Sequence, residues 1–192
     1  MEIREELQSD VAAVQKLHRA AFAHQADQVD GLVQDLRHSL TSEPGLSLVA
    51  VDEGDEVVGH ALFTRNLLDA PSQLVDVQVL SPVGVRPDAQ RRGVGGALIR
   101  RGINTLAARA VPAVFLEGSP DYYSPFGFEP GADHSFRRPS LRIPKRGFQV
   151  LLLPAHEPWM TGTLVYRQDF WHHDLVGLRP SEPQWSFEAE ST

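Results

Sequence analysis

Residues 83–96 read Val-Gly-Val-Arg-Pro-Asp-Ala-Gln-Arg-Arg-Gly-Val-Gly-Gly. The residues before Pro87 are short and β-branched, as in a buried strand. The residues after Gly96 carry apolar side chains at helical spacing. The hydrophobic period therefore changes at the glycines, which predicts a strand that enters a helix through a glycine-rich turn.

This turn is suited to binding an anion. The first turn of a helix leaves backbone N–H groups unpaired and carries a partial positive charge. Gly93, Gly95 and Gly96 each cost about 0.5–1 kcal/mol relative to alanine in a helix, so their grouping at one end indicates the close approach of another group. Because Arg91 and Arg92 add positive charge beside them, we expect the turn to bind phosphate.

Three phosphate-binding patterns compete for the turn. It lacks the Lys-Ser/Thr of a Walker loop, and Leu98 stands where a dinucleotide fingerprint that starts at Gly93 has glycine or alanine. The third pattern, Gln/Arg-x-x-Gly-x-Gly/Ala, is matched by residues 90–95. It resembles the signature that holds the coenzyme A pyrophosphate in the GNAT superfamily of N-acyltransferases. The alternative is an arginine-rich turn whose glycines serve only helix packing.

Composition restricts the class of protein. A chain of 192 residues with 42% hydrophobic residues is long enough for one α/β domain. The net charge of −7 argues against extended binding to nucleic acid or to an anionic membrane. The absence of cysteine excludes disulfides and thiol catalysis. The N-terminus is too charged for a signal peptide and no long apolar run is present, so we expect a soluble, cytoplasmic protein.

The periodicity predicts alternating helices and strands of a mixed α/β fold. A helix capped by Ser9 or Asp10 and a second helix over 27–40 precede most of the strands. Pro82 cannot donate a ladder hydrogen bond, so we expect a bulge there. The expected strands cover residues 3–7, 46–51, 57–65, 74–85, 113–117 and 148–153, with an edge strand at 162–166 and a short helical turn at 121–124.

A second motif lies at residues 119–128, Ser-Pro-Asp-Tyr-Tyr-Ser-Pro-Phe-Gly-Phe. It resembles the Tyr-x-x-x-Gly-Phe element that follows the fifth strand of GNAT enzymes. A branch of small bacterial acetyltransferases has Gly-Asp-Pro-x-Tyr-Tyr here, and Ser119 replaces its aspartate. Together the two motifs make roughly residues 3–170 similar to the GNAT fold, a mixed α/β sheet that is splayed at its centre. We therefore expect a GNAT-like domain over 1–178 and a poorly ordered tail over 179–192.

The resemblance implies acetyl-CoA as the acyl donor, with no metal ion required. In this fold two central strands separate and the pantetheine arm of the donor lies in the gap. The strand end would hold that arm and the turn would hold the pyrophosphate. The donor-binding residues implied in this way are Val83, Gly84, Val85, Gln90, Arg91, Arg92, Gly93, Val94, Gly95 and Gly96.

Two residues are candidates for proton transfer. Tyr123, four residues before Gly127, stands where GNAT enzymes often place the acid that protonates the departing thiolate, and a tyrosine with a pKa of about 10 is protonated at pH 7. The alternative is that Tyr123 only packs in the core. Glu117, at the end of the fifth strand, matches a position where some members carry a general base that acts through water. The alternatives are a solvated or ion-paired carboxylate, and a free amine that needs no base.

Other residues are interpreted as structural. His60 lies on an expected strand, where we predict a hydrogen-bonded sheet residue. The run His172-His173-Asp174 has no accompanying ligand set and is predicted to be a surface cluster.

The predicted function is acetyl transfer from acetyl-CoA to an amine, by direct attack in a ternary complex. The acceptor is an unidentified small molecule or protein amine. The alternative is a noncatalytic acyl-CoA-binding sensor or scaffold, and the presence of Tyr123 favours the enzyme. The expected edge strand at 162–166 and the aromatic tail suggest a homodimer.

Overall fold

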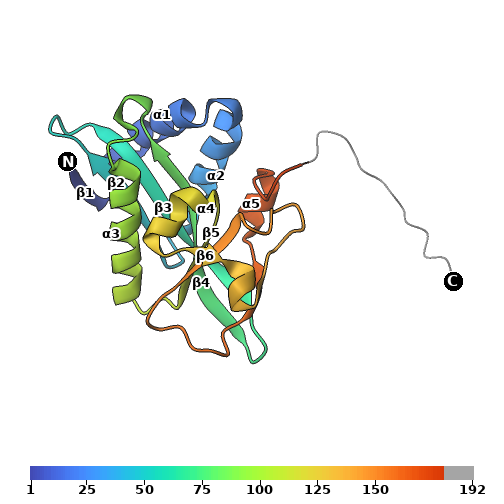
Figure 1. The fold of residues 1–192 in the computed structure, drawn as a ribbon. Helices are drawn as coiled ribbons and strands as arrows, with labels where there is room; N and C mark the ends of the chain where they lie inside the picture. The colour runs from blue at the N-terminus through green and yellow to red at the C-terminus, as the bar shows by residue number, and fades with distance from the viewer. Residues whose placement is uncertain (180–192) are drawn as a thin grey trace.

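The computed structural model describes residues 1–179, which form one mixed sheet covered by helices on both faces (Figure 1). The strand order is β1-β2-β3-β4-β5-β8-β6, with β9 paired to β3 and β7. The strands are β1 (Glu2–Glu5), β2 (Gly45–Val51), β3 (Val57–Asp69), β4 (Leu74–Val85), β5 (Ala113–Glu117), β6 (Glu129–Pro130), β7 (Phe136–Arg137), β8 (Phe148–Leu152) and β9 (Gly162–Val165). The α-helices are α1 (Val11–Ala21), α2 (Ala26–Ser39), α3 (Val94–Ala108), α4 (Pro120–Tyr123) and α5 (Gln168–His172).

Side-chain alternation along the strands divides the core between the two faces. On β2, Val49 and Val51 pack with α1 and α2, whereas Leu48 and Ala50 pack with α3. Burying an aliphatic side chain of this kind stabilises the fold by about 1.5–3 kcal/mol. The helices α1 and α2 therefore cover one face of the sheet, and α3 covers the other (Figure 1).

The sheet opens between β4 and β5, its two central parallel strands. They pair only through Gln78 and Val79 of β4, opposite Val114 and Phe115 of β5. On its other side β4 stays paired to β3 as far as Val85. The second half of β4 therefore has backbone groups on its β5 side that no strand of the sheet uses.

A bulge lies where the two central strands separate. The register between β3 and β4 shifts at Ser81 and Pro82, which together stand opposite the single residue Leu62. Because a proline cannot donate to the ladder, the irregularity expected at this position is confirmed.

The predicted bounds of β4 and β5 agree with the structure, and α2 agrees within one residue. β3 is longer than predicted, since its end pairs with both β4 and β9. The prediction of a free edge at 162–166 is wrong. β9 pairs with β3 through Thr163–Val165 and, on its other side, with β7 through Gly162 and Thr163, so the first half of this strand lies inside the sheet.

The predicted tail at 179–192 lies, apart from its first residue, outside the described residues. Within the described part of the chain, none of the helices combines the length and the apolar character that a membrane crossing needs.

Candidate functional site

A cavity of about 520 Å³, here called the turn cavity, lies where β4 ends and α3 begins. Eight of the ten residues predicted to bind the donor line it, and Gly84 and Arg92 do not. The aromatic residues after β5 form the opposite wall. The lining residues are Val83, Val85, Gln90, Arg91, Gly93, Val94, Gly95, Gly96, Arg100, Tyr122, Tyr123 and Phe126.

The turn has the backbone geometry of an anion site. Gly93 precedes α3 with a φ of +84°, a conformation that favours glycine. The N–H of Ala97 donates to the carbonyl of Gly93 at 2.9 Å and closes the first turn of the helix. The helix therefore does not use the N–H groups of residues 94–96. These amides and the positive end of the helix dipole suit a phosphate group.

The other two glycines of the turn let aromatic side chains approach α3. A Cβ on Gly95 would lie 2.5 Å from the Tyr122 hydroxyl oxygen, and one on Gly96 would lie 3.1 Å from the Phe126 ring. The Arg100 guanidinium lies 4.9 Å from the centre of the Phe126 ring. Glycine is therefore needed at positions 95 and 96 in part because Tyr122 and Phe126 pack closely against them.

Sequence reasoning missed Arg100 and Phe126 as lining residues of the turn cavity. Arg100 stands one helical turn after Gly96, so it shares a face with the glycine turn, and that spacing was the available signal. Tyr122 also lines the turn cavity.

The end of β4 presents alternate residues to opposite faces of the sheet. Val83 and Val85 face the turn cavity. Gly84 faces α1, where a Cβ would lie 2.8 Å from both His18 and Leu17. Gly84 can therefore contribute only backbone groups to a ligand in the gap.

Tyr123 packs against the core and also faces the turn cavity. Its ring packs against Phe128 with centroids 5.8 Å apart, and the residue also lines the turn cavity. Burial, with a smaller effect of Tyr122, raises the pKa of Tyr123 to about 12. The hydroxyl is therefore protonated at neutral pH and can donate a proton or a hydrogen bond.

Glu117 lies at the end of β5, on a second cavity on the α2 side of the sheet. This cavity, here called the Glu117 cavity, has a volume of about 160 Å³. Ser81 and Pro82 of the β4 bulge also line it, so it meets the gap between the central strands from the face opposite α3. The remaining lining residues are Phe22, Gln25, Val29, Leu32, Val79, Tyr166, Phe170 and Leu175.

The surroundings of Glu117 act on its pKa in both directions. Burial raises the pKa above its ordinary value, while the Tyr166 hydroxyl and the Gly177 N–H, 3.0 Å from Oε2, hold the carboxylate by hydrogen bonds and lower it. The net shift is upward. Burial and the nearby carboxylate raise the pKa of Tyr166 well above its ordinary value, so Tyr166 remains the donor in this pair.

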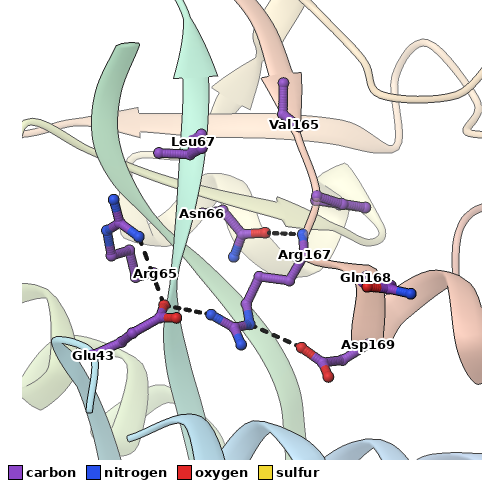
Figure 2. Close-up of a pocket in the computed structure, with 9 residues that line it drawn as sticks. Glu43, Arg65, Asn66, Leu67, Val165, Arg167, Gln168 and Asp169 are labelled. Atoms are coloured by element: carbon purple, nitrogen blue, oxygen red, sulfur yellow. Dashed lines mark hydrogen bonds and ion pairs between the residues drawn. The ribbon is translucent and has the colours of Figure 1, made fainter.

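Figure 2 shows a third cavity, whose charged side chains form ion pairs with one another. The Arg167 guanidinium pairs with Glu43 and, at 2.9 Å, with Asp169. The backbone N–H of Arg167 donates to Asn66 Oδ1 at 2.9 Å. Tyr166 lines both this cavity and the Glu117 cavity. The network therefore fixes the segment that places the Tyr166 hydroxyl beside Glu117.

A separate buried network, here called the His18 network, joins α1 to the first three strands. His18 Nε2 donates to His60 Nδ1 at 2.8 Å, His60 Nε2 donates to Ser47 Oγ at 2.9 Å, and Ser47 donates to Glu6. The direction of donation follows because an ionised carboxylate only accepts. The prediction that His60 is a hydrogen-bonded sheet residue is confirmed.

The residues of the run 172–174 each have their own polar partner in the described chain. His173 Nε2 pairs with Asp35 at 2.7 Å, and Asp174 pairs with Arg142 at 2.9 Å. Its histidines are thus engaged in surface interactions rather than gathered around one point.

Comparisons with known proteins agree with this geometry. Residues 2–131 match the family model described as an acetyltransferase (GNAT) domain. The chain is 38% identical over 126 residues to YjhQ, an uncharacterized N-acetyltransferase of Escherichia coli K12, covering 65% of this chain and 67% of YjhQ. It is 32% identical over 175 residues to the uncharacterized N-acetyltransferase YhbS of the same strain, covering 88% of this chain and 98% of YhbS.

Two solved structures are similar over most of the fold. The crystal structure of E. coli YhbS in complex with CoA superposes with a TM-score of 0.78 at 29% identity, covering 88% of this chain and 91% of that one. A GNAT acetyltransferase from Brucella melitensis in complex with acetyl-CoA gives a TM-score of 0.69 at 30% identity, covering 88% and 97%.

Proposed function

This chain belongs to the GNAT acetyltransferase family, and from that premise we propose that it transfers the acetyl group of acetyl-CoA to an amine by direct attack in a ternary complex. The observation that carries the proposal is the pair of cavities on opposite faces of the gap between β4 and β5. A donor in one and an acceptor in the other meet at the gap, so no covalent enzyme intermediate is needed.

The turn cavity is the donor site in this proposal. The amides of residues 94–96 hold the pyrophosphate, with positive charge supplied by Arg91 and Arg100. The backbone of residues 83–85 is unpaired on its β5 side, which suits the amides of the pantetheine arm. Arg92 does not line the cavity and is given no direct contact.

The reaction requires proton transfer at two groups, the attacking amine and the departing thiolate. An ammonium group loses one proton to become a nucleophile, and Glu117 is the base in this proposal. The nitrogen then bonds to the carbonyl carbon of the thioester, the carbon–sulfur bond breaks, and Tyr123 protonates the departing thiolate. The amide nitrogen loses a second proton, which restores Tyr123, so one proton is released in each turnover.

The donor site is tested by thermal unfolding with and without acetyl-CoA. Gly93→Glu places bulk and negative charge where the pyrophosphate binds, so the rise in melting temperature produced by acetyl-CoA should disappear. Gly93→Ala is the matched control, because it carries the same strain at positive φ without the charge and should keep most of the rise. An undiminished rise in Gly93→Glu would rule out this donor site.

The alternative is a noncatalytic acyl-CoA-binding sensor or scaffold. It shares the donor site and differs in turnover, so release of coenzyme A with a panel of amines separates the two. The lining of the Glu117 cavity favours a small-molecule amine over a protein amine, since the space is about 160 Å³. A single domain over 1–178, a cytoplasmic location and a homodimer stay predictions from the sequence.

A further inference from the structure

The wall of the Glu117 cavity is mostly apolar. The wall is supplied by α2 and the connection before it, by the β4 bulge, and by α5 with the residues after it. Its apolar members are Phe22, Val29, Leu32, Val79, Pro82, Phe170 and Leu175. An apolar cavity of roughly 150 Å³ accommodates one benzene-sized group. The volume of about 160 Å³ therefore matches a single ring or a branched alkyl group of similar size.

The polar groups of this cavity are few, and most are already engaged. Of its lining residues, only Glu117 carries a formal charge. The carboxylate accepts from the Gly177 N–H and the Tyr166 hydroxyl, which hold it in place and leave it able to accept from an ammonium group. Gln25 and Ser81 are the other polar lining residues.

This distribution of charge discriminates among amines. A second ammonium group within the cavity would have no carboxylate partner, and a carboxylate on the acceptor would have no lysine or arginine partner among the lining residues. A charged group that is buried without a partner is strongly disfavoured. The lining thus favours an acceptor with one amino group and no other charge.

We propose that the acceptor is a primary amine joined by a short linker to one uncharged apolar group of about the size of a benzene ring. The apolar group lies in the Glu117 cavity and the amine lies between Glu117 and the gap that opens toward the donor. This proposal rests on the function proposed above. Glu117 takes the proton of the ammonium group before the carbon–nitrogen bond forms and the carbon–sulfur bond breaks.

Three probes of similar size test the class of acceptor. Release of coenzyme A from acetyl-CoA is measured with 2-phenylethylamine, with L-phenylalanine, which adds only a carboxylate, and with 1,4-diaminobutane, which replaces the ring by a second ammonium group. We expect kcat/KM to be at least 100-fold higher for 2-phenylethylamine than for either of the others. Equal or higher values for L-phenylalanine or 1,4-diaminobutane would overturn the proposal.

A variant that fills the cavity from its rim tests the location. Gln25 is exposed and lines the cavity, so Gln25→Trp adds a large side chain with little disturbance of the core. We expect KM for 2-phenylethylamine to rise at least 10-fold, with an unchanged melting shift from acetyl-CoA. Gln28→Trp is the matched control, because Gln28 is exposed in the first turn of α2, three residues after Gln25, and does not line the cavity. An unchanged KM in Gln25→Trp would place the acceptor elsewhere.

The outcomes separate this inference from the proposed function. Calorimetric titration of 2-phenylethylamine into the protein saturated with coenzyme A gives a readout that does not need turnover, and one equivalent should bind. If acetyl-CoA binds and no amine is acetylated, the proposed function fails. If a charged or peptide amine is acetylated in preference, only the inference about the acceptor fails.

Discussion

Tyr123 and Glu117 lie on opposite faces of the gap between β4 and β5. Their surroundings act differently on the pKa of each group. Burial raises the pKa of Tyr123 to about 12, which keeps its proton in place at neutral pH. Burial also raises the pKa of Glu117, but the Gly177 N–H and the Tyr166 hydroxyl oppose that shift. One residue is thus suited to donate a proton and the other to accept one.

The acid role is tested by Tyr123→Phe, which removes the hydroxyl and keeps the ring. We expect kcat to fall by about 10²–10⁴-fold, the usual contribution of a positioned acid. The melting shift from acetyl-CoA should stay as in the unaltered protein, because the ring still lines the cavity. If Tyr123 serves only to pack, kcat will be unchanged, and only the melting temperature of the protein without acetyl-CoA will differ from that of the unaltered protein.

The segment that joins β9 to α5 connects a structural ion-pair network to the candidate site. Arg167 is held by Glu43 from the connection between α2 and β2 and by Asn66 from β3, as Figure 2 shows. Its neighbour Tyr166 is almost fully buried and reaches Glu117. Two segments far apart in the sequence therefore determine where one hydroxyl lies.

The contribution of this segment is tested by Tyr166→Phe. The hydroxyl stabilises the ionised form of Glu117, so its loss raises the pKa of that carboxyl. A base with a higher pKa is lost to protonation at a higher pH, and we expect the acid limb of kcat/KM against pH to move upward. Arg167→Ala should move it in the same direction by loosening the segment. If the acid limb of Tyr166→Phe stays in place, either Glu117 is not the general base or Tyr166 does not affect its pKa.

At the scale of the whole molecule, the His18 network ties α1, β1, β2 and β3 together through buried polar groups. Burial, with smaller effects of His60 and Arg37, lowers the pKa of His18 to about 2. Burial acts to raise the pKa of Glu6, but hydrogen bonds from His60 and Arg37 outweigh it and lower that pKa to about 2. The folded state therefore keeps His18 neutral and Glu6 ionised.

These shifts predict how stability depends on pH. The unfolded state protonates histidine below about pH 6.5 and the folded state does not, so the free energy of unfolding should fall as pH drops from 6.5 toward 2, by about 1.4 kcal/mol per pH unit for His18. Glu6 adds a further loss as pH drops from about 4.5 toward 2. Urea unfolding at several pH values measures the slope.

One variant measures the contribution of His18 to this pH dependence. His18→Gln should reduce the slope between pH 6.5 and 4.5, whatever its effect on stability at pH 7, while His60, whose pKa burial also lowers, keeps its own contribution. His24→Gln is the control, because His24 is exposed and takes no part in the network. Equal slopes in the two variants would contradict the assignment.

The turn cavity, which we propose as the donor site, could be predicted in large part from the sequence alone. β4, the glycine turn and α3 are contiguous, so periodicity, proline and glycine were enough to predict them and most of the turn cavity. The residues that sequence reasoning missed there, Arg100 and Phe126, reach the cavity from the next helical turn and from the segment after α4.

The Glu117 cavity, where we propose that the acceptor binds, could be found only from the three-dimensional fold. Glu117 was predicted as a candidate base, but its partners Tyr166 and Gly177 and the apolar wall come from segments dispersed from residue 22 to residue 177. Local sequence patterns carry no information about such contacts, because burial, charge pairing and cavity shape arise only when the helices pack against the sheet. The same reason applies to β9, which the sequence predicted as an edge strand and whose first two residues pair with β7.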